Sequence, residues 1–241
     1  MRDHLTTLEA RPSRRDLLAG AAALSATAAY SAALAQGVGD LAALPHTAGG
    51  YLFFTDAEAT AVEAMVDRLI PAGGVGPGAI EAGVPTFLDR ALRAGYGLGE
   101  GQYLEGPFQA GTPEQGYQLP LEPHQLYRVA LADIADWAQA VHGAPFAELP
   151  PATQDDALRL MQSGDMALAN LPAALFFGTF WFDVRTAYFS DPIHGGNRDM
   201  AAWRMVGFPG AYTDLRPYLS ADTAIEIEPV SLAQVLNLEE R

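Results

Sequence analysis

Apolar residues recur at helical spacing along most of the chain, and this spacing restricts the folds that the chain can adopt. Thr55 and Glu58 match a capping box, in which each side chain accepts a hydrogen bond from a free backbone N–H group at the start of a helix. The apolar residues that follow fall at i, i+3, i+4, i+7 and i+8, which predicts a helix with one buried stripe: Val62, Met65, Val66, Leu69 and Ile70. Pro71 is expected to end this helix.

The rest of the chain repeats this periodicity between loops that are rich in Gly and Pro. Further helices are predicted over about residues 80–93, 123–141, 152–161, 172–188 and 198–206. Alternation typical of strands is scarce, and no internal repeat is present. The predicted fold is therefore mainly α, an irregular helical domain of about five or six helices with long Gly- and Pro-rich loops.

For two segments, the sequence pattern does not decide between packing in the core and contact with a partner. The segment that begins at Pro172 is apolar on several sides, so we expect either a central helix or a helix that touches a partner. Residues 95–121 have no clear period but contain several aromatic residues. They could form an arm over the domain's own core or a surface that contacts another protein or a small ligand.

The N-terminal residues have the features of a signal peptide for twin-arginine export. Arg14 and Arg15 match the paired arginines of that signal, and Leu17 and Leu18 supply its two apolar positions at the start of an Ala-rich stretch. A small-x-small sequence before Gln36 predicts cleavage there. A retained signal that anchors the protein is the alternative.

This prediction divides the chain into four parts. They are a signal peptide at 1–35, a linker at 36–51, a helical domain at 52–212 and a C-terminal arm at 213–241. We expect the protein to be periplasmic, because the twin-arginine signal directs export.

The chain is strongly acidic, with 29 Asp and Glu against 14 basic residues and a formal net charge of -15. All 14 basic residues are Arg, because the sequence contains no Lys. Such a charge repels nucleic-acid phosphates and anionic lipid headgroups. Cysteine is absent, which excludes disulfides, thiolate zinc sites, cysteine-ligated iron–sulfur clusters and covalently attached c-type haem in this chain.

Recognisable motifs for cofactors and catalysis are also missing from the sequence. A formal dinucleotide fingerprint at 37–42 has no strand before it, and no Gly-x-Ser-x-Gly elbow exists. The histidines after residue 35 lack the spacing of metal ligands: His46, His124, His142 and His194. We therefore predict no catalytic, cofactor-binding or metal-binding residue in this chain.

One dense polar cluster, which we call the 191–200 loop, stands out from the rest. Two adjacent glycines allow backbone conformations that other residues avoid. We predict a docking surface for another subunit, built from the loop and the aromatic turn after it: Asp191, His194, Asn197, Arg198, Trp203 and Phe208. A purely structural turn is an open alternative, as is a catalytic or ligand-binding site centred on residues 191–199.

The 191–200 loop and three other stretches of the chain resemble the gluconate 2-dehydrogenase subunit 3 family. The similar stretches lie at residues 67–71, 106–117, 191–200 and 203–210. The most specific is the run Asp-Pro-Ile-His-Gly-Gly-Asn-Arg-Asp, which is followed by Gly-Phe-Pro-Gly. The similarity spans about residues 52–212.

The resemblance implies a non-catalytic small subunit of a flavin-dependent sugar or sugar-acid dehydrogenase. A large partner subunit would hold FAD, and a multihaem cytochrome c is expected as an optional third subunit that passes electrons to the membrane. The small subunit would support folding, stability and export of the flavin subunit. Membrane association would then arise through the complex. An independent periplasmic enzyme or a small-ligand binding module remains the alternative.

Overall fold

The computed structural model describes residues 50–74, 76–108, 112, 117–212, 214, 216 and 227–236. The predicted export signal, including Arg14, Arg15, Leu17 and Leu18, lies outside the described residues. The described parts of the chain contain α-helices, short 3-10 helices and isolated bridges but no strand, which confirms the mainly α prediction. The α-helices are α2 (Asp56–Leu69), α3 (Val84–Arg93), α4 (Pro123–His142), α5 (Pro151–Ser163), α6 (Ala173–Phe189), α7 (Ala201–Val206) and α8 (Leu232–Val235).

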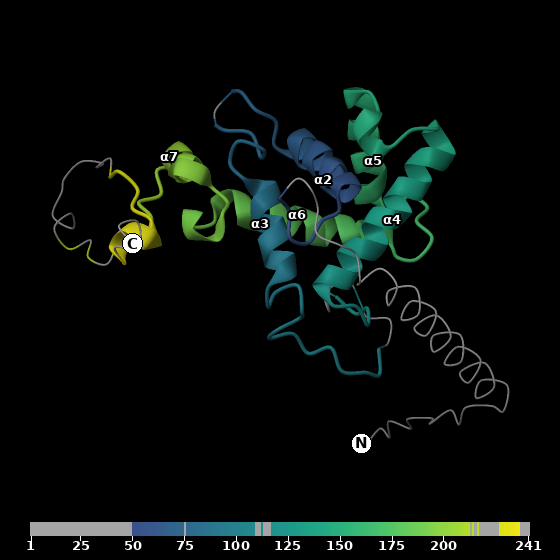
Figure 1. Ribbon diagram of the computed structural model, residues 1–241, viewed down its shortest axis with the longest axis horizontal. Helices are drawn as coiled ribbons and strands as arrows, with labels where there is room; N and C mark the ends of the chain where they lie inside the picture. The colour runs from purple at the N-terminus through teal and green to yellow at the C-terminus, as the bar shows by residue number, and fades with distance from the viewer. Residues whose placement is uncertain are drawn as a thin grey trace, which may run out of the picture. The chain divides into compact units, whose positions relative to one another are not determined.

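Helix α6 is the central element of the fold, as Figure 1 shows. It contacts α3, α4, α5 and α7, so helices that are far apart in the sequence meet on it. Phe176 and Phe180 are fully buried and stack with ring centroids 5.6 Å apart. Tyr127 of α4 meets Phe176 edge-to-face at 5.4 Å. This aromatic cluster forms the centre of the core, because large apolar surfaces gain most from leaving water.

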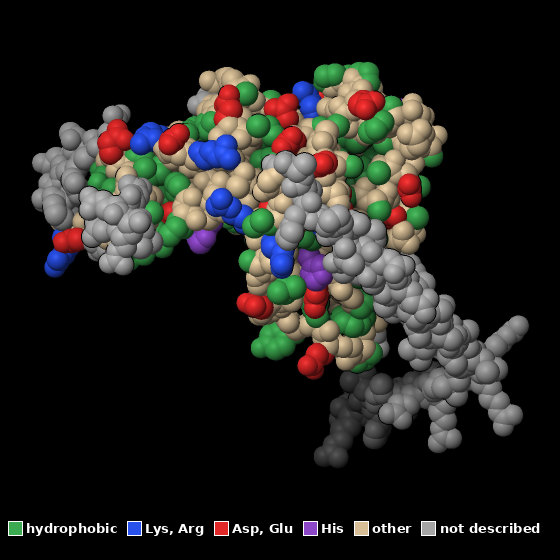
Figure 2. Space-filling model, in the orientation of Figure 1, with side chains coloured by type: hydrophobic (Ala, Val, Ile, Leu, Met, Phe, Trp, Pro, Cys, Tyr) green, Lys and Arg blue, Asp and Glu red, His purple; other side chains and the backbone are tan. Residues whose placement is uncertain are grey.

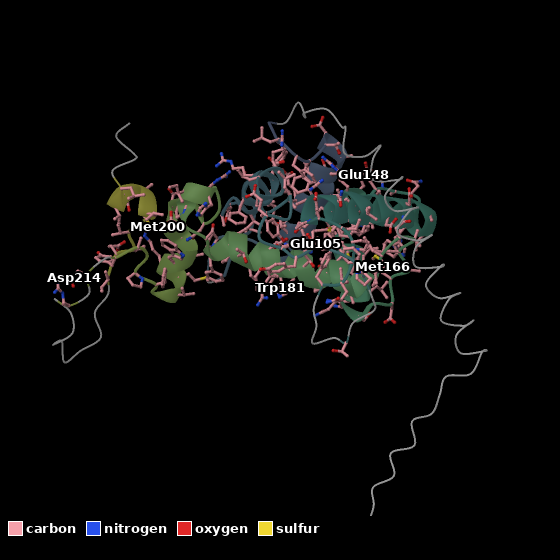
Figure 3. The ribbon with its side chains drawn as sticks, turned by 90° about the horizontal axis from the view of Figure 1, so that it is seen from below. Glu105, Glu148, Met166, Trp181, Met200 and Asp214 are labelled. Carbon is pink, nitrogen blue, oxygen red and sulfur yellow. The ribbon has the colours of Figure 1, made fainter. Side chains whose placement is uncertain are left out.

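The outer side of α6 is also partly apolar. Phe182 is 60% exposed, and Phe189 is exposed near the end of the helix. Trp181 lies on α6, as labelled in Figure 3, and the Arg185 guanidinium is 5.4 Å from the centre of its ring. The helix is therefore central, as one of the two predictions held, and it also presents aromatic side chains to the solvent.

The start of α2 follows its sequence signals closely. Thr55 accepts a hydrogen bond from the Glu58 N–H, and Glu58 accepts one from the Thr55 N–H, so the predicted capping box is present. Val62, Met65 and Val66 are fully buried. The helix ends at Leu69, just before Pro71.

The segment that precedes α2 is held to the domain by two buried polar side chains. The Asp89 carboxylate accepts hydrogen bonds from the N–H groups of residues 52, 53 and 54 at 2.7, 2.7 and 3.0 Å. Arg128 of α4 donates to the Phe53 carbonyl and pairs with Glu58. Its guanidinium also lies 4.0 Å from the centre of the Phe53 ring. Because every one of these polar groups has a partner, their burial is compensated.

Two helix boundaries differ from the sequence predictions. Helix α3 begins at Val84 and not near residue 80, because Gly83 adopts φ 80°, which a right-handed helix cannot include. The helix predicted at 198–206 is a 3-10 turn, η4 (Arg198–Met200), followed by the short α7. Asn197, Asp199 and Met200 all have positive φ, so a continuous right-handed helix cannot begin before Ala201.

The described residues between 95 and 121 lie partly against the core and partly on the surface, and contact of this segment with a partner or ligand stays a prediction. Tyr96 is half-buried and its hydroxyl reaches Asp183 of α6, whereas Tyr103 is fully exposed. Tyr117 donates to the Leu121 carbonyl at 2.6 Å. Within the described residues, no helix has the length and hydrophobicity that crossing a bilayer requires.

Candidate partner-binding site

The 191–200 loop begins where α6 ends, and its first side chain acts as a local anchor. The Asp191 carboxylate accepts from the Ile193 N–H at 3.0 Å and so caps the short 3-10 helix η3 (Pro192–His194). Its other oxygen accepts from the Leu232 N–H at 2.7 Å. Asp191 therefore joins the loop to α8 in the C-terminal part of the chain.

Asn197 links the end of α6 to the start of α7. Its side chain is fully buried. The amide nitrogen donates to the Ser190 carbonyl at 3.0 Å, and the amide oxygen accepts from the Ala202 N–H at 2.9 Å. Its φ of 44° lies in the left-handed region, which Asn tolerates better than most residues. Asn197 thus satisfies both the hydrogen-bonding and the backbone requirements of this turn.

Gly196 is required by close packing. A Cβ atom at this position would meet the Ala187 carbonyl oxygen and would lie 2.7 Å from the Ser190 hydroxyl oxygen. The loop can approach the end of α6 this closely only without a side chain. Met200, labelled in Figure 3, is buried at the end of the loop, next to α7.

Trp203 and Phe208 form an aromatic pair behind the loop. Trp203 is buried, and its indole N–H donates to the Phe189 carbonyl at 2.8 Å. The Phe208 ring meets the Trp203 ring edge-to-face, with centroids 5.2 Å apart. Phe208 itself is 47% exposed. The pair therefore has an inner member that holds α6 and an outer member that faces solvent.

His194 and Arg198 are the two exposed polar side chains of the predicted docking set. The Arg198 N–H donates to the Ala82 carbonyl at 3.1 Å, and its guanidinium donates to the Thr86 hydroxyl at 3.2 Å. No described residue forms a hydrogen bond with the His194 ring, so the structure does not pair it with Asp191 or Asp199. Among the described residues, no cluster of three or more acidic or His side chains is arranged to hold a metal ion.

The six predicted docking residues thus fall into two groups. Asp191, Asn197 and Trp203 are engaged in contacts within the chain, which is what the structural interpretation of the loop expects. His194, Arg198 and Phe208 are exposed next to them and are available for contact with another protein. Their docking role stays a prediction.

Sequence reasoning did not single out two exposed arginines of α3, the first of which lies beside this loop. Arg90 and Arg93 are exposed, and the Arg90 guanidinium lies against Gly195, where a Cβ would come within 2.9 Å of its Nη1 atom. The signal was present in the sequence: Thr86, Arg90 and Arg93 are spaced at i, i+4 and i+7, which places them on one face of a helix. The closeness of Arg90 to the loop depends on tertiary packing.

A second unpredicted feature is a buried carboxyl group on α6. Asp183 is 5% exposed and accepts hydrogen bonds from the hydroxyls of Tyr96 and Tyr127. Burial raises the pKa of Asp183 to about 6, and the two tyrosine hydrogen bonds partly oppose this rise. No arginine side chain pairs with it among the described residues. This carboxyl group is enclosed by the core and is not part of a surface site.

The structure thus defines a small helical domain with a polar loop that is tightly packed on one side and exposed on the other. The chain belongs to the gluconate 2-dehydrogenase subunit 3 family, whose model matches residues 56–210. Members of this family are subunits of a multi-subunit dehydrogenase complex, which is consistent with a larger dehydrogenase subunit as partner. No curated protein and no solved structure matches the chain.

Proposed function

We propose that this chain is the non-catalytic small subunit of an exported, FAD-dependent sugar or sugar-acid dehydrogenase complex. In this proposal it supports the folding and stability of the flavin subunit and carries the export signal for both. The observation that supports it most directly is the family match over residues 56–210, which covers the helical domain and the 191–200 loop.

The predicted export signal explains why such a subunit would be needed. The twin-arginine pattern at Arg14 and Arg15 lies ahead of the family domain. Twin-arginine export moves proteins that are already folded, so a partner that has bound its flavin in the cytoplasm can travel with a chain that bears the signal. The complex would then reside in the periplasm and meet the membrane through its other parts.

The redox groups belong to other chains in this proposal. FAD would be held by the large subunit, and haem c by a cytochrome subunit where one is present. The contribution of this chain is a rigid surface. Asn197 bonds the loop to α7, and Trp203 bonds the turn after it to the end of α6, so Arg198 and Phe208 are already positioned for contact. A preorganised surface loses less conformational entropy when a partner binds.

The export part of the proposal is tested by replacing both Arg14 and Arg15 with Lys in a strain that co-expresses the flavin subunit. We expect dehydrogenase activity to remain in the cytoplasmic fraction. An Arg2→Lys variant is the matched control, because it makes the same chemical change outside the twin-arginine pattern. Full periplasmic activity in the double variant would contradict the escort role.

The accessory role is tested separately by purification. We expect the mature chain and the large subunit to co-purify, with the flavin absorbance in the large subunit. Oxidation of a sugar or sugar acid by this chain alone would overturn the non-catalytic assignment.

A further inference from the structure

Most described arginines pair with a carboxylate of the same chain. Arg68 pairs with Asp155 and Arg128 with Glu58, while the remaining pairs join Arg159 to Asp156, Arg204 to Glu228 and Arg216 to Asp214. In a chain with twice as many acidic as basic residues, such pairing is expected. Four described arginines have no described carboxylate partner: Arg90, Arg93, Arg185 and Arg198. Of these, Arg185 lies over the Trp181 ring.

The other three form what we call the arginine row: Arg198, Arg90 and Arg93. Thr86, Arg90 and Arg93 lie on one face of α3, and at 1.5 Å per residue they span roughly 10 Å along the helix. Arg198 extends this line because its guanidinium donates to the Thr86 hydroxyl. All three arginines are exposed. Figure 2 shows basic side chains, in blue, across the region over α3.

A hollow of about 410 Å³ lies at the start of the arginine row. Its lining includes Tyr51, Thr86 and Arg90. Arg198 lies next to this hollow, because its guanidinium donates a hydrogen bond to the Thr86 hydroxyl of the lining. The two carboxylates of the lining have donors of their own: Asp89 accepts three backbone N–H groups, and Glu63 accepts the Tyr51 hydroxyl at 2.6 Å. They are therefore already engaged within the chain.

We propose that the arginine row binds an acidic segment of the dehydrogenase partner subunit, an inference that rests on the proposed function. A guanidinium is suited to a carboxylate because it offers two parallel N–H donors. The row presents three such groups in line, which fits carboxylates spaced one helical turn apart on a partner. The overall charge of -15 disfavours anionic lipid surfaces, whereas a local basic row can still select an acidic segment of a protein.

Part of the row also has an explanation within the helix. Arg90 and Arg93 lie in the last turn of α3, where positive charge is favoured by the helix dipole. This explanation does not apply to Arg198, which comes from the 191–200 loop and is directed to the same face by its bonds to Ala82 and Thr86. The convergence of side chains from two separate segments is what points to an external anion.

The first experiment changes the charge of the row in the complex. Arg90→Glu with Arg198→Glu should weaken association with the co-expressed dehydrogenase subunit by at least about tenfold and should reduce its salt dependence. The matched control is Arg159→Glu on α5, which reverses an exposed arginine away from the row. Arg90→Gln with Arg198→Gln removes the two charges without adding repulsion. This second variant tests the row if the Glu variant does not fold.

The second experiment uses the absence of Lys from the chain. Arg90→Lys or Arg198→Lys introduces a single side-chain amine, which a carbodiimide can join directly to a nearby carboxylate. We expect mass spectrometry to find this amine linked to Asp or Glu of the dehydrogenase subunit. The Arg159→Lys control should give no link to the partner.

The outcomes separate this inference from the proposed function. If the wild-type chain does not associate with a flavin subunit, the proposed function fails. If the complex forms normally but the Glu and Gln double variants bind as tightly as wild type, only the arginine-row inference is overturned. If the wild-type chain binds anionic vesicles, and these variants lose that binding while the complex stays intact, the row binds lipid. This result would likewise overturn the arginine-row inference.

Discussion

The Asp183 carboxylate of α6 accepts a 2.7 Å hydrogen bond from the Tyr127 hydroxyl of α4, and both side chains are buried. Tyr96 donates to the same carboxylate at 2.9 Å. The three residues connect α6, α4 and the segment after α3 without any described positive charge beside the carboxylate. Because burial raises its pKa to about 6, Asp183 binds a proton more tightly in the folded protein than in the unfolded chain.

This raised pKa predicts a specific loss of stability as the pH increases. A group with a raised folded-state pKa stabilises the fold fully below its unfolded pKa, near 3.8, and loses that contribution as the pH rises through about 6. The free energy of unfolding of the wild type, measured against an Asp183→Asn variant, should therefore fall by on the order of 1–3 kcal/mol between about pH 4 and pH 7. Urea unfolding at a series of pH values measures this difference.

An Asp136→Asn variant provides the control, because Asp136 is exposed on α4. Its difference from wild type should change little over the same pH range. If Asp183→Asn and Asp136→Asn give parallel curves, the carboxyl group of Asp183 does not titrate as the structure indicates.

The second prediction concerns the anchoring of the segment before α2 by Asp89. An Asp89→Asn substitution leaves one acceptor oxygen where the carboxylate serves three N–H groups. We expect the free energy of unfolding to fall by about 1–3 kcal/mol, because buried N–H groups lose their acceptor. Hydrogen exchange at Leu52, Phe53 and Phe54 should accelerate more than exchange in the α6 core.

Hydrogen exchange also separates this effect from general destabilisation. If all amides exchange faster by the same factor, Asp89 stabilises the whole domain and not this segment in particular. Unchanged exchange at residues 52–54 would show that the three hydrogen bonds contribute little in solution.

The sequence predicted the helices best where local signals were complete. Thr55 and Glu58 lie three residues apart, so their capping box and the stripe behind it could be recognised directly. Pro123 likewise marked the first residue of α4. The start of α3 was misplaced because the apolar period runs on through residues 80–83. Gly83, which has a positive φ, packs closely against Gly195 and Arg198 of the 191–200 loop, a contact that no local pattern encodes.

The sequence identified the 191–200 loop as a distinctive polar segment, but it did not indicate which side chains of the loop and the turn after it are buried and which are exposed. The dense composition identified the 191–200 loop, and the resemblance gave its family. The burial of Asn197 and the exposure of Phe208 depend on α6 and α7 packing together, which no local pattern encodes. The Asp183 cluster was missed for the same reason, since Tyr96 and Tyr127 are 87 and 56 residues away from Asp183 in the chain.

The third prediction separates the two roles of Asn197. Asn197→Ala removes the hydrogen bonds to Ser190 and Ala202 and also strains the left-handed backbone. Asn197→Gly removes the same hydrogen bonds but tolerates the backbone. We expect both variants to lower the free energy of unfolding, with Ala worse than Gly by about 1–2 kcal/mol. Equal losses would indicate that the backbone strain is negligible.

The fourth prediction tests Phe208 as a contact for the partner. Its ring is half-exposed and rests on the buried Trp203, so Phe208→Ala removes outer surface while the Trp203 bond to Phe189 remains. We expect the association with the flavin subunit to weaken by about 1–2 kcal/mol, because aromatic side chains are frequent energetic anchors at interfaces. The free energy of unfolding of the isolated chain should change by less than about 1 kcal/mol.

Leu160→Ala on α5 is the matched control for Phe208→Ala, because Leu160 is also a large apolar residue with a half-exposed side chain. Its removal should leave association unchanged. Trp203→Ala is a poorer probe of docking, since the loss of a buried indole typically costs about 3–5 kcal/mol of folding stability and would weaken association indirectly. If Phe208→Ala binds the flavin subunit as tightly as wild type, Phe208 serves only to cover Trp203 and is not a contact for the partner.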